Sequence, residues 1–405
     1  MQEVKSKLVP KGTITSAKGF LAAAVPAGLK TTGQGMADLG ILYSEVPAIA
    51  AGVFTTNKIK AAPVILCQRH LAKRSAQAII ANSGCANACT GEQGMRDAIE
   101  MANLAAKKLG ISAQDVLVAS TGVIGACLPV EHIRAGVERV TPSAEGGHEL
   151  AKAITTTDAA PKELAVTFNL SGSEIIVGGI AKGAGMIHPN LATLLCFLAT
   201  DAAVDPDFLQ QALKKAVDVS FNMITIDGDT SPNDTVLLLA NGLAGNEVIA
   251  DGLPAEMFQG ALDEICLYLA RQVVKGGEGA TKLIEVRVEG ASSVAEARLA
   301  ARAIAASPLV KTAVHGCDPN WGRIIAALGR SGSQVEEAKL DLFLADVCLM
   351  EKGKPTPFDR ERTKAILGQD EVNIRLCLNL GDGEATAWGC DLSEEYVKIN
   401  SEYTT

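Results

Sequence analysis

The feature that most constrains the fold of this chain is the alternation of helix-like and strand-like segments along its 405 residues. Strong helix formers fill three segments, 94–109, 206–218 and 254–274. The first of them runs into Gly110, a residue type that commonly ends helices. VLVAS at 116–120, after the first helical segment, and the alternating LIEVRVE at 283–289, after the third, have the apolar pattern of strands. This order predicts a mixed α and β architecture, and the length allows two or three domains.

The C-terminal third is predicted to be rich in strands. Ser293 and Glu296 form the signature of a capping box, so a helix is expected over 293–306. Apolar residues then recur with the frequency typical of sheet at 340–350, 372–380 and 395–400. No internal repeat or linker divides the chain, and composition gives only a soft domain boundary near 190–205.

Composition and charge exclude several classes of protein. Aromatic residues make up 4% of the chain and the net charge is −9, so a nucleic-acid surface is not expected. The uncharged segment 183–200 is long enough to span a bilayer, but it contains His188, Pro189 and Asn190, which a membrane interior would penalise. The N-terminal MQEVKSKLVPKG lacks the apolar core of a secretory signal. We therefore expect a cytoplasmic protein that binds neither nucleic acid nor membranes.

Neither the cysteines nor the histidines are spaced as metal ligands. The ten cysteines are scattered and are expected to be reduced, with Cys85 and Cys89 the only close pair. The five histidines lie far apart, so no metal site is predicted. The acidic segment 227–234 resembles a calcium loop but lacks the 12-residue spacing with a terminal Glu. A hydrogen-bonded loop is the prediction there.

Eight polar and glycine-rich stretches are notable because a hydrophobic core does not require them. They are NSGCANACTG at 82–91, ASTGVIG at 119–125, TTTDAAPK at 155–162, KGAGMIHPNLAT at 182–193, NMITIDGDTSPNDTV at 222–236, KGGEGATK at 275–282, HGCDPNWGR at 315–323 and NSEYTT at 400–405. Each alone is typical of a turn. Eight in one chain, rich in Thr, Asn, Gly and Asp, predict a site that loops assemble on a rigid scaffold.

Several of these stretches, in this order, resemble one enzyme family. KGAGMIHPNLATLL, TTTDAAPK, NMITIDGDTSPNDTVLLLANG and HGCDPNWGRI are similar to segments of the ornithine acetyltransferases, the bifunctional glutamate N-acetyltransferases of arginine biosynthesis (ArgJ family). The likeness extends from KGFLAAAVPAGLK to the tail. It implies a layered α and β fold of the N-terminal-nucleophile type with two domains. It further implies acetyl transfer from N2-acetylornithine to glutamate, acetyl-CoA as a second donor, and no cofactor.

The resemblance also implies that the chain cuts itself between Ala192 and Thr193, giving an α chain of residues 1–192 and a β chain of residues 193–405. Physical chemistry gives Thr193 a reason to become N-terminal. An internal Thr hydroxyl has no base of its own, whereas an N-terminal Thr carries an α-amine with a pKa of about 7.7–8.0 that can take the hydroxyl proton. Without the family, Thr193 is an ordinary β-branched residue before the buried strand LLCFL.

Family correspondence implies roles for further residues. Thr121 and Gly122 are implied as the oxyanion hole, each donor being worth about 3–4 kcal/mol in acyl-transfer sites. Substrate binding is implied for Thr156, Lys182, Thr193, Glu278, Asn400 and Thr405. Lys182 suits a carboxylate and Glu278 suits an ammonium group, as a zwitterionic amino acid requires. Which of the adjacent threonines at 155–157 contacts the substrate stays open.

Two other functions stay open from the residues themselves. An N-terminal-Thr amidohydrolase or aminopeptidase would use the same nucleophile but would pass the acyl group to water. A non-catalytic amino-acid-binding protein would stay uncut and would tolerate Thr193→Ala. The resemblance implies an assembly of two α and two β chains, an α2β2 heterotetramer.

Overall fold

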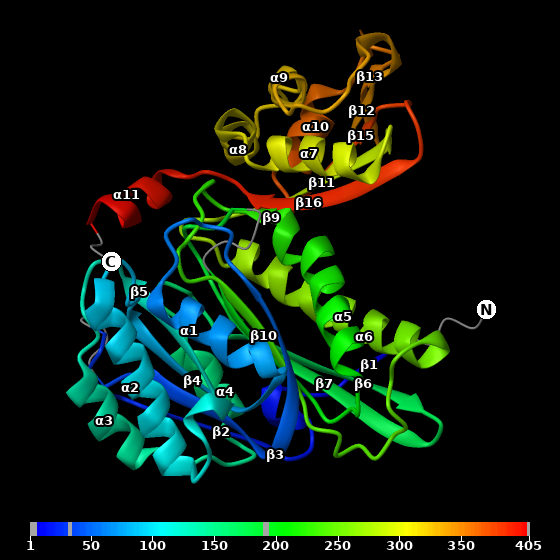
Figure 1. Cartoon of the computed structure of the whole chain (residues 1–405). Helices are drawn as coiled ribbons and strands as arrows, with labels where there is room; N and C mark the ends of the chain where they lie inside the picture. The colour runs from blue at the N-terminus through cyan, green and yellow to red at the C-terminus, as the bar shows by residue number, and fades with distance from the viewer. Residues whose placement is uncertain (1–5, 31–34, 189–193, 403–405) are drawn as a thin grey trace.

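A computed structural model describes residues 6–30, 35–188 and 194–402 of the chain, and within them the elements build two sheets with helices packed around them (Figure 1). The larger sheet has nine strands and the smaller has seven. The mixed α and β architecture predicted from the alternating segments is confirmed.

The larger sheet contains strands from both halves of the chain. They are β1 (Lys7–Leu8), β2 (Phe20–Val25), β3 (Leu39–Phe54), β4 (Ser75–Cys85), β5 (Val116–Val123), β6 (Lys162–Leu170), β7 (Ser173–Lys182), β8 (Leu195–Thr200) and β10 (Thr235–Ala240). Their order is β1-β6-β7-β8-β10-β3-β4-β5, and β2 pairs with β3 beside this path. Since β7 pairs antiparallel with β8, strands from both sides of the composition boundary expected near 190–205 lie next to each other in one sheet.

Two hydrophobic cores meet at the larger sheet because side chains alternate along its strands. Cys196 and Leu198 of β8 belong to the core that includes α5 (Pro206–Val219) and α6 (Gly252–Lys275). Phe197 and Ala199 belong to a second core, which includes the other helices that pack on this sheet. Those helices are α1 (Ala62–His70), α2 (Gly91–Leu109), α3 (Val130–Arg139) and α4 (Gly147–Ala153). Burial on both sides explains why β8 is apolar from Leu195 to Ala199.

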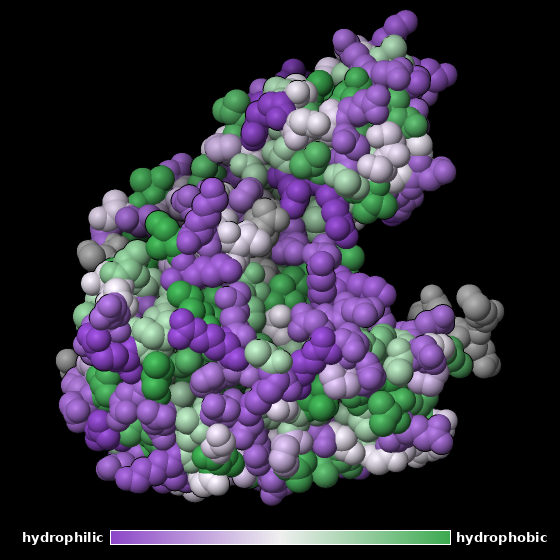
Figure 2. Space-filling view, in the orientation of Figure 1, coloured by the Kyte–Doolittle hydropathy of each residue, from purple (hydrophilic) through white to green (hydrophobic). Residues whose placement is uncertain are grey.

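The smaller sheet forms the upper lobe in Figure 1 and comes almost wholly from the C-terminal third. Its strands are β9 (Ile224–Thr225), β11 (Leu283–Ala291), β12 (Asp341–Leu344), β13 (Val347–Glu351), β14 (Lys354–Pro355), β15 (Glu371–Cys377) and β16 (Gly383–Cys390). The helices around it are α7 (Val294–Ala305), α8 (Pro308–His315), α9 (Gly322–Gly329) and α10 (Arg360–Leu367). Hydrophilic side chains border the notch between the two lobes on the face that Figure 2 shows.

Most elements follow the sequence pattern. The helices expected at 94–109, 206–218 and 254–274 are α2, α5 and α6, and Gly110 caps α2 with a left-handed φ of 71°. The apolar segment 340–350 forms the hairpin β12–β13, which turns at Ala345. These elements carry strong periodicity, so local sequence was sufficient to predict them.

The strand expected at 395–400 is wrong, because these residues lie in α11 (Glu394–Glu402). No residue of this helix is fully buried. Ser393 starts the helix, because its Oγ accepts a hydrogen bond from the backbone N–H of Tyr396 at 3.4 Å. Two glutamates in the first turn further stabilise its N-terminus.

No helix in the described part of the chain is long and apolar enough to cross a membrane.

Candidate active site

One pocket, with a volume of about 660 Å³ including its open mouth, collects residues from most of the polar stretches. It is lined by Ala86, Thr121, Gly122, Ile124, Thr156, Thr157, Lys182, Gly185, Met186, Ser231, Asn233, Glu278 and Asn400. Six of these are predicted site residues: Thr121, Gly122, Thr156, Lys182, Glu278 and Asn400. The other three predicted residues, Ala192, Thr193 and Thr405, lie outside the described part of the chain.

The Thr121–Gly122 turn is shaped by a close approach of two strands. β4 and β5 run parallel, and Gly84 lies opposite Gly122. Gly122 has a φ of 128°, and a Cβ added to it would lie 2.3 Å from the backbone carbon of Gly84. Only glycine fits this backbone and this spacing. The motif at 119–125 therefore needs its glycine for the backbone geometry that places Thr121 in the pocket wall.

Lys182 ends β7 as a buried cation, with 2% of its surface exposed. Its Nζ donates a hydrogen bond of 3.2 Å to Thr121 Oγ1. Burial lowers the pKa of Lys182, while the nearby Asp158 carboxylate opposes that shift. The negative charges around the lysine therefore favour its cationic form, and a bound carboxylate would add another.

Asp158 organises this wall of the pocket. It forms a buried ion pair with Lys162, and it accepts hydrogen bonds from the backbone N–H of Thr156 at 3.1 Å and of Gly183 at 2.8 Å. Burial opposes its ionisation, but Lys162 and Lys182 hold the pKa of Asp158 below its usual value. One carboxylate thus fixes the backbone beside Thr156 and beside Lys182.

Glu278 and Asn400 also line the pocket and contact each other. Asn400 Nδ2 donates a hydrogen bond of 2.8 Å to Glu278 Oε2. The loop after α6 brings Glu278 to this place, since its backbone N–H donates to the carbonyl of Ala184 at 2.8 Å. Gly279 has a left-handed φ of 67°, and a Cβ there would lie 2.4 Å from the backbone nitrogen of Tyr396 in α11. The glycines around Glu278 therefore let the loop pack directly on α11.

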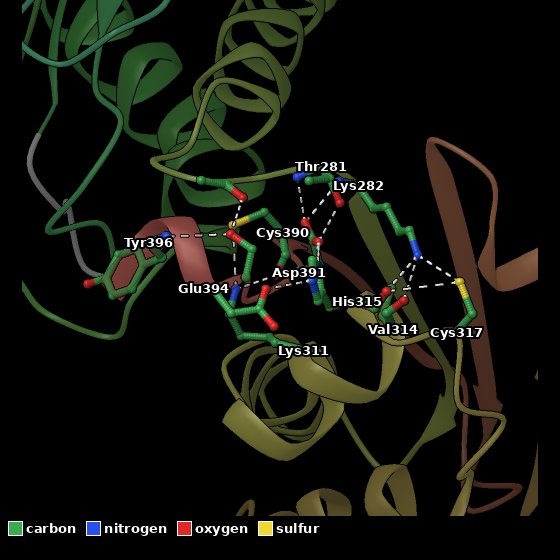
Figure 3. Close-up of polar contacts among 12 residues, drawn as sticks. Thr281, Lys282, Lys311, Val314, His315, Cys317, Cys390, Asp391, Glu394 and Tyr396 are labelled. Carbon is green, nitrogen blue, oxygen red and sulfur yellow. Dashed lines mark hydrogen bonds and ion pairs between the residues drawn. The ribbon is translucent and has the colours of Figure 1, made fainter. Parts of the chain in front are cut away.

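A polar network anchors the start of α11 to this loop (Figure 3). Asp391 accepts hydrogen bonds of 2.8 Å from the backbone N–H groups of Thr281 and Lys282, and one of 2.6 Å from the Thr281 hydroxyl. His315 lies 2.7 Å from Asp391 Oδ2 through Nδ1 and 3.3 Å from Glu394 Oε2 through Nε2. The motif at 315–323 thus contributes to the site indirectly, by fixing the helix that carries Asn400.

Two carboxyl groups, the half-buried Asp227 and the buried Asp234, bind the backbone on either side of residues 189–193. Asp227 accepts hydrogen bonds from the backbone N–H groups of Met186 at 2.5 Å and of Ile187 at 2.9 Å. Asp234 accepts one from the backbone N–H of Leu194 at 3.0 Å. The prediction that 227–234 is a hydrogen-bonded loop is confirmed by these contacts.

Some of the pocket residues were not predicted individually. Ser231 and Asn233 line it, and Asn233 Nδ2 crosslinks it by donating to the carbonyls of Ala86 at 2.6 Å and of Ser120 at 2.8 Å. Their only sequence signal was the polar stretch 222–236. Of the three adjacent threonines, Thr156 and Thr157 line the pocket, whereas the Thr155 hydroxyl donates to the carbonyl of Lys152 at 2.7 Å.

Cysteines and metal ligands do not define a second site within the described residues. All ten cysteines are free, with Cys85 buried and Cys89 exposed. Cys317 lies 3.1 Å from Lys282 Nζ at the edge of the network in Figure 3. Over the described ranges, no group of three or more His, Cys, Asp or Glu side chains is arranged to hold a metal ion.

Known proteins are similar to this chain over nearly its whole length. The model of the ArgJ family matches residues 21–405. The arginine biosynthesis bifunctional protein ArgJ of Dehalococcoides mccartyi is 53% identical over 399 residues, which are 98% of either chain. The protein of the same name from Symbiobacterium thermophilum is 52% identical over 397 residues, 97% of this chain and 99% of the relative. The crystal structure of ArgJ from Bacillus halodurans is 45% identical with a TM-score of 0.50, and it covers 51% of this chain and 98% of its own.

Proposed function

The chain belongs to the ArgJ family and is an acetyltransferase of arginine biosynthesis, and we propose that it carries acetyl from N2-acetylornithine to glutamate on the hydroxyl of Thr193. The observation that carries this proposal is the convergence of six family-matched residues in one pocket. They come from positions between 121 and 400, so only the complete fold brings them together.

The pocket offers donors for the oxyanion of acyl transfer. Thr121 Oγ1 accepts a hydrogen bond from Lys182 Nζ, which leaves the hydroxyl proton of Thr121 to be donated. The cation behind this hydroxyl polarises it, and donors near a charge form stronger hydrogen bonds. Thr121 and Gly122 would therefore stabilise the negative oxygen that forms when the Thr193 hydroxyl attacks the acetamide carbonyl.

The pocket also has both charges that an amino acid requires. Lys182 supplies a buried positive charge, and Glu278 supplies a carboxylate elsewhere in the pocket lining. A zwitterionic ligand that spans them would pair its carboxylate with Lys182 and its ammonium with Glu278, with Asn400 fixing the Glu278 side chain. Both ornithine and glutamate carry these groups, so one pocket can bind donor and acceptor in turn.

In the proposed cycle the Thr193 hydroxyl first attacks the Ala192 carbonyl and displaces the peptide nitrogen. Water then hydrolyses the resulting ester, so that the new α-amine of Thr193 can act as the base. The Thr193 oxygen then bonds to the acetyl carbon, the proton moves through the amine to the leaving nitrogen, and ornithine departs. Glutamate reverses these steps and takes the acetyl group. The solved Bacillus halodurans chain supports a cut, because it covers about half of this chain but nearly all of itself.

The test is acetyl transfer by purified protein. Ornithine release from N2-acetylornithine should depend on glutamate, with N-acetylglutamate formed in equal amount. Thr193→Ala should stay uncut and lose at least about 10³-fold in rate, whereas the matched control Thr193→Ser keeps a hydroxyl and should be cut and active. Ornithine release that does not depend on glutamate would favour the amidohydrolase. The binding protein would be favoured if the wild type showed no turnover and the uncut Thr193→Ala chain bound ligand unchanged.

Three finer parts of the proposal need their own measurements. Acetyl-CoA is proposed as a second donor, which glutamate acetylation in the absence of acetylornithine would test. An α2β2 heterotetramer is proposed, which light scattering of the cut protein would test. The reaction as written transfers acetyl directly and uses no cofactor. A cytoplasmic site of action is proposed from the biosynthetic family to which the chain belongs.

A further inference from the structure

A second cavity, of about 660 Å³ including its open mouth, lies between the two lobes, where the C-terminal end of α5 meets α7. Figure 1 shows α7 above this end of α5. Asp218, Asn222 and Met223 line the cavity from the side of α5, and Arg298 and Arg302 line it from α7. The cavity shares no lining residue with the acetyl-transfer pocket, so it is a separate place for a ligand.

The two arginines place two positive charges in this cavity. Arg298 and Arg302 are four residues apart on α7, so their side chains lie on the same face of the helix. Both side chains are partly buried, and within the described ranges neither guanidinium group forms a hydrogen bond or an ion pair. Burial and the charge of Arg298 lower the pKa of Arg302, although an arginine stays charged at neutral pH. Two like charges that repel each other therefore line one cavity.

The carboxylate that lines the same cavity does not neutralise them. Asp218 Oδ1 accepts a hydrogen bond of 2.8 Å from Asn222 Nδ2, and Asp218 forms no ion pair with either arginine. Partly buried arginines are normally paired, as Arg271 is with two glutamates at 3.1 and 3.2 Å. The pair on α7 is thus suited to an anion that comes from solution.

The chemistry of the lining favours a phosphate group on an organic molecule. A guanidinium group presents its N–H donors as a planar fork that fits a phosphate through two hydrogen bonds. Two such forks on one helix face can bind the same phosphate or two linked ones. Met223 and Leu299 add apolar surface to the cavity, which can contact the organic part of the ligand.

The position of the cavity points to acetyl-CoA, the second donor of the proposed function. Burial and the charge of Arg302 lower the pKa of His188, which follows by two residues the Met186 that lines the acetyl-transfer pocket. Lys182 is the single cation among the described residues of that pocket, and it is proposed to bind a carboxylate. The phosphate groups of acetyl-CoA therefore need positive charges outside the pocket but near it.

We propose that Arg298 and Arg302 bind a phosphate group, the one that acetyl-CoA carries when this donor replaces N2-acetylornithine. The assignment of the coenzyme rests on the proposed function, because it needs acetyl-CoA to be a donor. The binding of phosphate itself does not depend on that function.

Calorimetry of the purified protein tests the site, with coenzyme A and inorganic pyrophosphate as probes in phosphate-free buffer at constant ionic strength. The wild type should bind both probes. The double variant Arg298→Gln/Arg302→Gln should bind them about 10-fold or more weakly, because it loses charge-assisted hydrogen bonds to phosphate. Arg360→Gln is the matched control, since Arg360 is exposed and lines neither cavity, and it should bind as the wild type does.

Kinetics distinguish the two sources of phosphate. In the double variant the KM for acetyl-CoA should rise about 10-fold or more, while the KM for N2-acetylornithine stays within about twofold. If pyrophosphate binding is lost but the KM for acetyl-CoA is unchanged, the coenzyme assignment is overturned and free phosphate is the ligand.

Equal binding of the probes by the wild type and the double variant overturns the whole inference, and so does a wild type that binds neither probe. Wild-type protein that transfers acetyl to glutamate from neither donor would instead overturn the proposed function, whatever calorimetry shows.

Discussion

Gly185 lies next to Glu278, so a substitution at Gly185 should displace the Glu278 carboxylate while Glu278 itself is unchanged. A Cβ added at Gly185 would lie 2.6 Å from Glu278 Oε2, 2.8 Å from its Cδ and 3.0 Å from its Oε1. Ordinary contacts begin near 3.4 Å, so the carboxylate would have to move by about 0.8 Å. That movement would break the hydrogen bond of 2.8 Å from Asn400 to the same oxygen.

The Gly185→Ala enzyme should therefore fold and be cut but bind substrate poorly. A misplacement of about 1 Å in a site can cost up to about 10²-fold, so kcat/KM should fall about 10- to 100-fold, which is about 1.4–2.8 kcal/mol of transition-state stabilisation. Rates of glutamate-dependent ornithine release give this value, and intact mass confirms the two chains beforehand. Gly260→Ala in α6 is the control, because no atom lies within 4 Å of its added Cβ.

A double variant separates the clash from other effects. Glu278→Asp shortens the side chain and leaves room for the methyl group at Gly185. Adding Gly185→Ala should therefore cost much less in the Glu278→Asp background than in the wild type, which is the coupling expected of residues in contact. Wild-type kcat/KM for Gly185→Ala, or the same loss in both backgrounds, would refute this reasoning.

Three further changes test the scaffold. Gly122→Ala should lower the thermal midpoint by about 5 °C or more, because its Cβ would lie 2.3 Å from the backbone of Gly84. Lys162→Met should cost about 3–5 kcal/mol in denaturant unfolding by leaving Asp158 as a buried unpaired charge, and Asp158→Asn in the same chain should recover part of it. Burial opposes ionisation of Asp391, but hydrogen bonds hold its pKa below the usual value, so its contribution is present above about pH 4 and is lost as pH falls further. Proteolysis of α11 should accordingly increase at low pH, and Asp391→Asn should make it pH-independent; unchanged proteolysis across this range would contradict the assignment.

Local sequence was sufficient for the elements with strong periodicity and clear ends. α2 ends at Gly110 as expected, and α7 begins after Ser293, whose Oγ accepts from the Glu296 N–H at 3.3 Å. The capping box is only half formed, because the Glu296 carboxylate accepts from the distant backbone N–H of Gln334 instead. Tertiary contacts decided that detail, and no local pattern could predict it.

The site was predicted only where a motif could be matched. Thr121, Lys182 and Glu278 came from such matches, and the fold brings them to one pocket. Asp158 was not singled out, and Asp234 was noted only as part of the hydrogen-bonded loop at 227–234, since their importance lies in burial and in their partners in the folded chain. A carboxylate in a polar stretch is typical of a solvated turn, and only the packed structure reveals that it is buried.

The intact masses of the purified protein, together with the N-terminal residue of each chain, test the central claim most directly. The account predicts two chains, residues 1–192 and 193–405, the second beginning with Thr193 and gaining one acetyl group from N2-acetylornithine that glutamate then removes. A folded and fully active protein that remains a single chain of 42.0 kDa would contradict it.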